Sequence, residues 1–168
     1  MHRRTLLKVG IVSSIGLALL GGAAASIQPG FEHGALTSAG REVFRSICNG
    51  VLDKTLPEEA AARRAALDGL LNDIGVLLSA LPAHTHAEVS QLLSILSTTA
   101  GRYGLAGLNM PWASATSEQV QTALQNMRFS SLAVRQQAYG ALHDIAAGAY
   151  FSKSENWAML GYPGPLKI

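Results

Sequence analysis

The sequence predicts an all-α fold, with about five amphipathic helices in one bundle-like domain. From residue 38 onward, apolar residues recur three and four positions apart, the spacing that lines one face of a helix. No segment alternates apolar and polar residues over the length of a strand. Prolines and glycines separate the periodic stretches, so short links between helices are expected. The helical domain is therefore expected over residues 38–151.

The first helix is expected over residues 39–54. Thr37 or Ser38 can cap its start, and Pro57 marks its end. The chain's single cysteine lies in this helix, so an intramolecular disulfide is excluded, and its position among apolar residues favours a buried, inert thiol over a nucleophile. The apolar stripe of the helix consists of Val43, Phe44, Ile47, Cys48, Val51 and Leu52.

The second and third helices each follow a segment with the spacing of a capping box. Thr55 and Glu58 precede the second helix, expected over residues 58–81, and Pro82 ends it. Thr85 and Glu88 open the third helix, and Gly101 is its expected end. The predicted inner faces are Leu67, Leu70, Leu71, Ile74, Leu77, Leu78 and Leu81 in the second helix and Val89, Leu92, Leu93 and Leu96 in the third.

Residues 101–116 are expected to form an irregular, packed loop because they are rich in glycine and contain Pro111 and Trp112. A fourth helix is expected from Ser117 and a fifth from Ser130 or Ser131. After residue 150 the helical period is lost. The inner faces are expected to comprise Val120, Ala123, Leu124 and Met127, followed by Leu132, Tyr139, Leu142, Ile145, Ala146 and Ala149.

Two adjacent arginines near the start precede an uncharged, mostly apolar stretch over residues 9–27. A basic start, an apolar middle and then small residues are typical of an export signal. The segment resembles a twin-arginine (Tat) signal, whose pattern is Ser/Thr-Arg-Arg-x-Phe-Leu-Lys. The matching positions are Arg3, Arg4, Leu7 and Lys8, with Leu6 in place of the Phe and His2 in place of the Ser/Thr.

A Tat signal implies recognition by the Tat translocase, export of a folded protein, and localisation in the periplasm. Residues 1–25 are therefore expected to be a twin-arginine signal peptide, and residues 26–37 a linker. The three alanines before Ser26 offer a small-residue cleavage site. Two outcomes stay open, which are cleavage before Ser26 and retention as an uncleaved anchor, for which the apolar stretch is long enough but rich in glycine.

The net charge changes if the signal is removed. The whole chain has a formal charge of +2, from 13 Lys and Arg against 11 Asp and Glu. Residues 1–25 contain three of the basic residues and no acidic one, so the remainder carries a charge near −1. Its basic residues are scattered along the sequence, whereas binding of nucleic acid requires clusters of them. No nucleic-acid partner is therefore expected.

Few residues suggest catalysis or metal binding. His84 and His86 stand two positions apart in the expected turn after the second helix, either as a metal-binding pair or as part of a solvated turn. His143 precedes Asp144 inside the fifth helix, where neighbouring side chains point in different directions, so no dyad is expected. No dinucleotide, phosphate, haem, serine-hydrolase or zinc-protease motif is present. No catalytic residue, metal or cofactor of its own is expected, and the alternative is a stand-alone periplasmic metal-binding protein or enzyme that uses these histidines.

The C-terminal segment, residues 152–168, combines aromatic residues with proline and glycine. Aromatic side chains on a stiff, non-helical terminus are typical anchors for a partner protein, so this segment is expected to be a docking tail. The other interpretation is that the tail folds back and closes the core of its own domain, and both can hold for different residues. The candidate partner-binding residues are Tyr150, Phe151, Trp157, Leu160, Gly161, Tyr162, Pro163 and Pro165.

This tail resembles the gluconate 2-dehydrogenase subunit 3 family. The resemblance rests on Gly-Ala-Tyr-Phe-Ser at residues 148–152 and on Trp-x-x-Leu-Gly-Tyr-Pro-Gly-Pro at residues 157–165. Residues 47–57, an apolar helix that runs into Leu-Pro, are similar to the family's first helix. The order of the helices extends the resemblance over most of the chain that follows the signal.

The resemblance implies a small, non-catalytic subunit of a membrane-associated oxidoreductase complex. Its partner would be a large FAD-containing dehydrogenase of the glucose–methanol–choline type, which lacks an export signal and crosses the membrane together with the small subunit. Electrons would pass from the FAD of the large subunit to a cytochrome subunit or to quinone. The resemblance thus places the chain in the periplasm at the inner membrane, which it would contact only through the signal segment or the complex.

Overall fold

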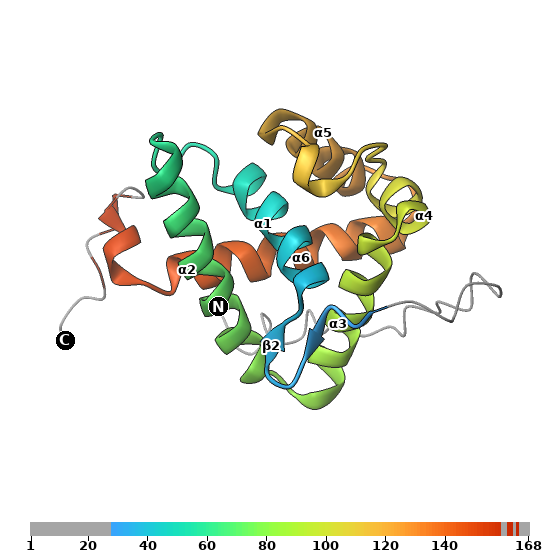
Figure 1. Cartoon of the computed structure of the whole chain (residues 1–168), viewed down its shortest axis with the longest axis horizontal. Coiled ribbons are helices and arrows are strands. Elements are labelled where there is room, and N and C mark those ends of the chain that lie inside the picture. Colours follow the sequence, from blue (N-terminus) through green and yellow to red (C-terminus); the bar gives the residue numbers. More distant parts are fainter. Residues whose placement is uncertain (1–27, 159–160, 163, 165–168) are drawn as a thin grey trace, which may run out of the picture.

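The computed structural model describes residues 28–158, 161, 162 and 164 of the 168-residue chain. This part is all-α apart from one two-stranded sheet, and the helices pack as a bundle-like domain, which confirms the predicted fold class (Figure 1). In chain order, the elements are β1 (Phe31–Glu32), β2 (Ala35–Leu36), α1 (Ser38–Val51), α2 (Ala60–Ser79), α3 (Ala83–Ser97), α4 (Thr99–Gly101), the π-helical turn η2 (Arg102–Ala106), the 3₁₀ turn η3 (Trp112–Ser114), α5 (Ser117–Arg128), α6 (Ala133–Phe151) and the 3₁₀ turn η4 (Ser154–Asn156).

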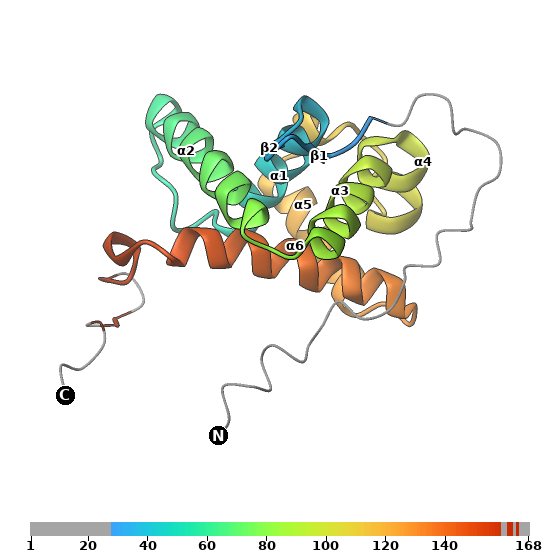
Figure 2. The ribbon, with the colours of Figure 1, turned by 90° about the horizontal axis from the view of Figure 1, so that it is seen from below.

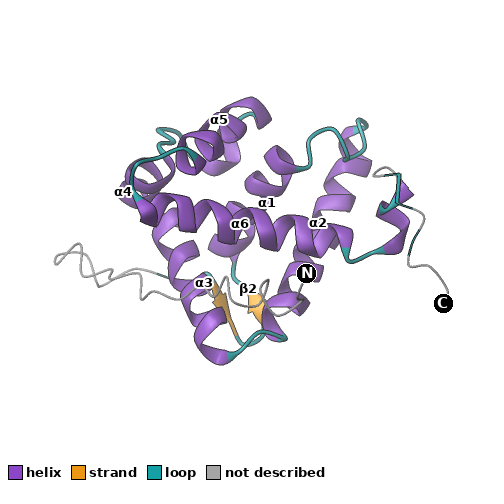
Figure 3. Cartoon of the chain, turned by 180° about the vertical axis from the view of Figure 1, so that it is seen from behind, coloured by secondary structure: helices purple, strands orange, loops and turns teal. Residues whose placement is uncertain are grey.

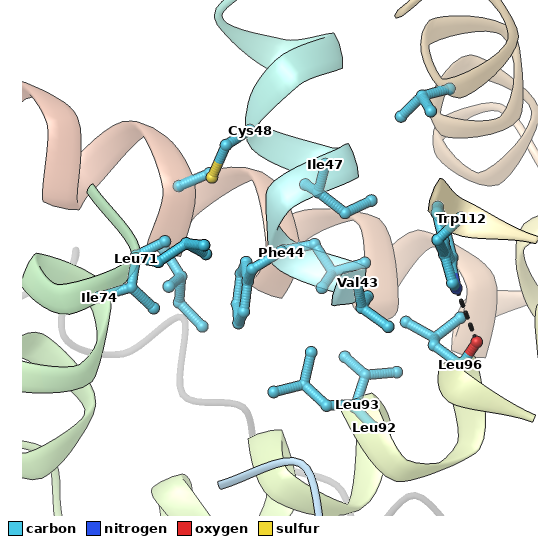
Figure 4. Packing of buried hydrophobic residues seen from close by; sticks show 14 of the residues in the cluster. Val43, Phe44, Ile47, Cys48, Leu71, Ile74, Leu92, Leu93, Leu96 and Trp112 are labelled. Carbon is cyan, nitrogen blue, oxygen red and sulfur yellow. Dashed lines mark hydrogen bonds between the residues drawn. The ribbon is translucent and has the colours of Figure 1, made fainter. Parts of the chain in front are cut away.

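Helix α1 lies at the centre and contacts α2, α3, α5 and α6. Helix α6, which has 19 residues, runs along one side of the molecule and contacts α1, α2 and α5 (Figure 2). Val43, Phe44, Ile47 and Cys48 of α1 are fully buried, as their spacing predicts. Figure 4 shows Phe44 and Val43 facing leucines and an isoleucine from α2 and α3. One contiguous core therefore holds the helices together.

The expected linker contains a β-hairpin that the sequence analysis did not predict. Phe31 pairs with Leu36, and Glu32 pairs with Ala35, in antiparallel register. The two turn residues, His33 and Gly34, both have positive φ, which suits a tight hairpin turn. The hairpin lies beside α2 and α3 (Figure 3). Two-residue strands are too short to produce an alternating pattern that sequence reasoning could detect.

Of the three predicted helix caps, one is right and two are wrong. Thr37 caps α1 by accepting a hydrogen bond from the Gly40 N–H. The proposed box at Thr55 is wrong, because α2 begins at Ala60 and the Glu59 carboxylate accepts from the N–H groups of the first turn. These hydrogen bonds lower the pKa of Glu59. The proposed box at Thr85 is also wrong, because Pro82 directly precedes α3.

Residues 101–116 are more regular than expected. A π-helical turn over Arg102–Ala106 follows α4 and ends at Gly107, whose φ is 73°. After it, Trp112 is buried, which confirms the packed part of the prediction. At the next helix a true capping box joins Thr116 and Gln119, which was not predicted. Helix α6 begins at Ala133, so Leu132 caps it and is exposed rather than part of the predicted inner face.

None of the helices in the described ranges has both the length and the apolar composition required to span a bilayer.

Candidate partner-binding site

The predicted docking residues gather where α6 ends, and the structure describes five of them. Tyr150 and Phe151 form the last turn of α6, and Trp157, Gly161 and Tyr162 follow η4. Figure 1 shows this red segment leaving one end of the long helix. The candidates Leu160, Pro163 and Pro165 lie outside the described residues.

Tyr150 is built into the domain. Its hydroxyl donates a hydrogen bond of 3.2 Å to the carbonyl oxygen of Thr55, in the link between α1 and α2. Its ring packs edge-on against Phe151, with 5.1 Å between ring centroids. The side-chain amide of Asn156 donates to the Tyr150 carbonyl oxygen at 2.6 Å. These contacts match the interpretation in which Tyr150 packs on its own domain instead of binding a partner.

Trp157 anchors the segment after α6. Its indole Nε1 donates a 2.7 Å hydrogen bond to the carbonyl oxygen of Phe151, an acceptor in the last turn of the helix that has no intrahelical donor of its own. The side chain is half-buried. Residues 154–156 form η4, which turns the chain back so that this bond can form. The hydrogen bond of Trp157 to Phe151 therefore fixes the start of the tail against the end of α6.

Trp157 and Tyr162 form an aromatic pair. Their ring centroids lie 5.4 Å apart, and the Tyr162 N–H donates to the Trp157 carbonyl oxygen at 3.3 Å. Gly161 allows the turn between them because its φ is 66°. The Tyr162 side chain is 48% exposed, so one ring of the pair is available to a partner surface.

An ion pair attaches the tail to the neighbouring helix. Lys153 Nζ lies 2.7 Å from Asp73 Oδ2 of α2. The hydrogen bond to Asp73 raises the pKa of Lys153, so this side chain is charged at neutral pH. Together with the Tyr150 bond, the pair fixes the end of α6 against α2 and the α1–α2 link.

The export-signal residues Arg3, Arg4, Leu6, Leu7 and Lys8 lie outside the described residues, as does the expected cleavage site. The structure therefore leaves residues 1–25 as a sequence prediction.

The structure does not bring the three candidate histidines together. His84 and His86 lie in the first turn of α3, where the ring of His86 packs edge-on against Phe31. His143 lies in the middle of α6. Within residues 28–158, 161, 162 and 164, no group of three or more His, Cys, Asp and Glu residues is arranged to hold a metal ion.

His143 and Asp144 touch through their side chains, although neighbouring positions on a helix point in different directions. His143 Nδ1 lies 3.1 Å from Asp144 Oδ1, and the imidazole stacks on Tyr139. Helix geometry sets the direction in which each side chain leaves the backbone, but the largely exposed Asp144 side chain can bend toward its neighbour. Both side chains are exposed in part, so the contact resembles a surface hydrogen bond more than a catalytic dyad.

Sequence reasoning missed a polar groove of about 660 Å³ between α1, α5 and α6. Arg128, Tyr139 and His143 line it, together with glutamine and glutamate side chains of α5. The Arg128 guanidinium lies 5.9 Å from the centre of the Tyr139 ring. These residues come from segments far apart in the sequence and share no motif, so no sequence signal points to the groove.

The thiol of Cys48 is buried, as predicted. Burial raises its pKa to about 12, so the nucleophilic thiolate does not form at neutral pH.

Comparisons of the chain with protein-family models, with curated proteins and with solved structures found no match.

Proposed function

We propose that this protein is a non-catalytic accessory subunit that binds and stabilises a large FAD-dependent dehydrogenase of the glucose–methanol–choline type and carries it through the Tat pathway. The FAD belongs to the large subunit, and a cytochrome subunit or quinone accepts its electrons. The complex acts in the periplasm at the inner membrane.

The observation that carries the proposal is the pairing of a twin-arginine pattern with a compact helical body. Arg3 and Arg4, followed by Leu7 and Lys8, match the signal that the Tat translocase reads on folded proteins. The body that follows has a single continuous core and is folded as one domain. A signal reserved for folded cargo suits a chain that binds its partner before export.

The tail supports the docking part of the proposal. Trp157 is held by its bond to Phe151, so its ring and the adjacent Tyr162 ring are positioned before a partner arrives. Preorganised aromatic side chains lose little conformational entropy on binding and are frequent hot spots of protein interfaces. Tyr150 and Lys153 hold the end of α6 in place, next to this aromatic pair, by their contacts with Thr55 and Asp73.

The export step is tested by replacing both arginines with lysine, Arg3→Lys together with Arg4→Lys, in cells that produce the dehydrogenase. The expected result is that both this protein and the flavoprotein remain in the cytoplasm, as measured by immunoblots of the periplasmic fraction. Arg64→Lys, at an exposed position of α2, is the matched control and leaves export unchanged. If the flavoprotein reaches the periplasm without this signal, the proposed co-export is wrong.

The docking step is tested separately by Trp157→Ala in the full chain. Co-purification of the flavoprotein is expected to fall, while circular dichroism shows the same helix content because the substitution lies outside the core cluster. Tyr103→Ala removes another exposed aromatic ring and serves as the control. Unchanged co-purification would remove Trp157 from the interface, and a stoichiometric metal in the purified protein would favour the histidine-based alternative.

A further inference from the structure

The turn between α5 and α6 exposes a large apolar side chain at each of its two ends. Phe129 ends α5 and is 75% exposed, and Leu132 caps α6 and is 57% exposed. Val134, in the first turn of α6, is also partly exposed. Apolar side chains that protrude together from one turn are uncommon on a protein that meets only water, and they indicate a contact surface.

The charges beside this turn are of one sign. Arg128 and Arg135 flank it, and no acidic residue occurs between Glu118 and Asp144 in the sequence. The Arg128 guanidinium lies over the Phe129 ring, 5.2 Å from its centre, and makes no ion pair with the described carboxylates. Arg135 donates from Nε to the Leu105 carbonyl oxygen of η2, and it makes no ion pair with a carboxylate in the described part.

Several backbone groups of the turn are hydrogen-bonded within the protein. The N–H groups of Phe129 and Ser130 donate to carbonyl oxygens of α5, and the Leu132 N–H donates to the Ser130 hydroxyl. The Ser130 carbonyl oxygen accepts from the side chain of Gln136 at 2.6 Å. These four groups therefore keep their hydrogen-bond partners in a less polar environment.

From these observations we infer that the α5–α6 turn is a membrane-contact site: Phe129 and Leu132 insert at the headgroup–acyl boundary of an anionic phospholipid bilayer, and Arg128 and Arg135 bind lipid phosphates. Arginine can extend its guanidinium toward the phosphates while its stem stays among apolar groups. The site is an exposed turn, so a protein partner would require a matching cavity, whereas a fluid bilayer surface requires none. Charge complementarity selects anionic lipid.

This inference goes beyond the proposed function, which connects the chain to the membrane only through its signal or its complex. The turn and the docking tail lie at opposite ends of α6 (Figure 2). A helix of 19 residues spans about 28 Å at 1.5 Å per residue, so a bilayer and a partner protein can be bound at the same time.

The test is vesicle flotation of the full chain with phosphatidylcholine alone and with phosphatidylcholine mixed with phosphatidylglycerol. The expected result is binding to the anionic vesicles that falls at least about tenfold in Phe129→Ser/Leu132→Ser. Val76→Ser removes an apolar side chain of similar exposure (73%) from α2 and should bind like the unmodified chain. All three proteins share residues 1–27, so a contribution from that segment cancels in the comparison.

A second measurement does not depend on deleting the apolar residues. Phe129→Trp is expected to show strong quenching by brominated lipid in anionic vesicles, whereas Val76→Trp is not. Arg128→Gln should reduce the preference for anionic lipid. Equal flotation of the unmodified chain and the double variant, or equal quenching at positions 129 and 76, would overturn the inference. Loss of a co-purifying protein in the double variant, without vesicle binding by the unmodified chain, would also overturn it.

Discussion

The indole nitrogen of Trp112 donates a 2.7 Å hydrogen bond to the carbonyl oxygen of Leu96 (Figure 4). Leu96 lies in the last turn of α3, where carbonyl groups have no helical donor. The Trp112 carbonyl oxygen in turn accepts a 2.7 Å bond from the Ser46 hydroxyl of α1. A single residue outside the long helices therefore joins α3 to α1 inside the core.

Trp112→Phe is expected to lower the free energy of unfolding by about 2 kcal/mol, because it leaves the buried Leu96 carbonyl oxygen unsatisfied and creates a small cavity. Urea denaturation followed by circular dichroism measures the change. Trp157→Phe, the same substitution at a half-buried position, is the control and should have a smaller effect. An equal loss at both positions would contradict the role assigned to Trp112.

Gly40→Ala is expected to destabilise the fold by about 2 kcal/mol even though alanine favours helices. A Cβ atom at position 40 would lie 2.0 Å from the carbonyl oxygen of Gly30, so the backbone would have to move. Gly69→Ala in α2 is the matched control, because a Cβ atom there meets no other atom within 4 Å. It should stabilise by up to about 1 kcal/mol. Thermal unfolding of both variants tests whether the two changes have opposite signs.

Stability should fall at acidic pH partly through Asp68. Its carboxylate accepts a 2.5 Å hydrogen bond from Arg45, and this bond, with the charges of Arg45, Arg41 and Arg64, lowers its pKa below that of a free aspartate side chain. The stabilisation is present above the unfolded-state pKa and is lost as the pH falls through that value toward the lower folded-state pKa. The melting temperature of Asp68→Asn should therefore change less between pH 5 and pH 2 than that of the unmodified chain. The two proteins should differ in this dependence at about pH 4 and below.

The control for this measurement is Glu42→Gln, at an exposed carboxylate of α1 that makes no ion pair with the described residues. If both variants follow the same melting curve against pH, the contribution of Asp68 is not specific.

Cys48 should not react with a thiol reagent in the native protein at pH 8. The thiol is buried and its pKa is raised to about 12. Labelling with a chromogenic disulfide is expected only after unfolding, so its rate reports opening of the core rather than thiol chemistry. Rapid labelling of one thiol per native chain would mean that α1 is accessible.

The helices were predictable because each has one apolar face of sufficient length. The stripe through Val43 and Ile47 identifies α1, and the leucines of the second helix identify α2, independently of their neighbours. Their starts were less predictable, because the same Thr-x-x-Glu spacing occurs at Thr55 and Thr85 without forming a cap. The position of a cap depends on where the preceding chain enters the helix.

The candidate site was only partly predictable. Composition identifies the aromatic tail, but the contacts of Tyr150 with Thr55 and of Lys153 with Asp73 join residues far apart in the sequence and leave no local pattern. The π-helical turn at Arg102 and the exposure of Leu132 also leave no local sequence pattern, because both depend on how the helices pack.

The contact between Gly30 and α1 also fixes where the folded body begins. The Gly30 N–H donates to the Ser90 carbonyl oxygen, the Gly30 carbonyl oxygen accepts from Thr37, and the Thr37 hydroxyl donates to Pro29. These bonds begin only three residues after position 26. A peptidase that cuts before Ser26 would therefore leave every partner in these three hydrogen bonds on the remaining chain.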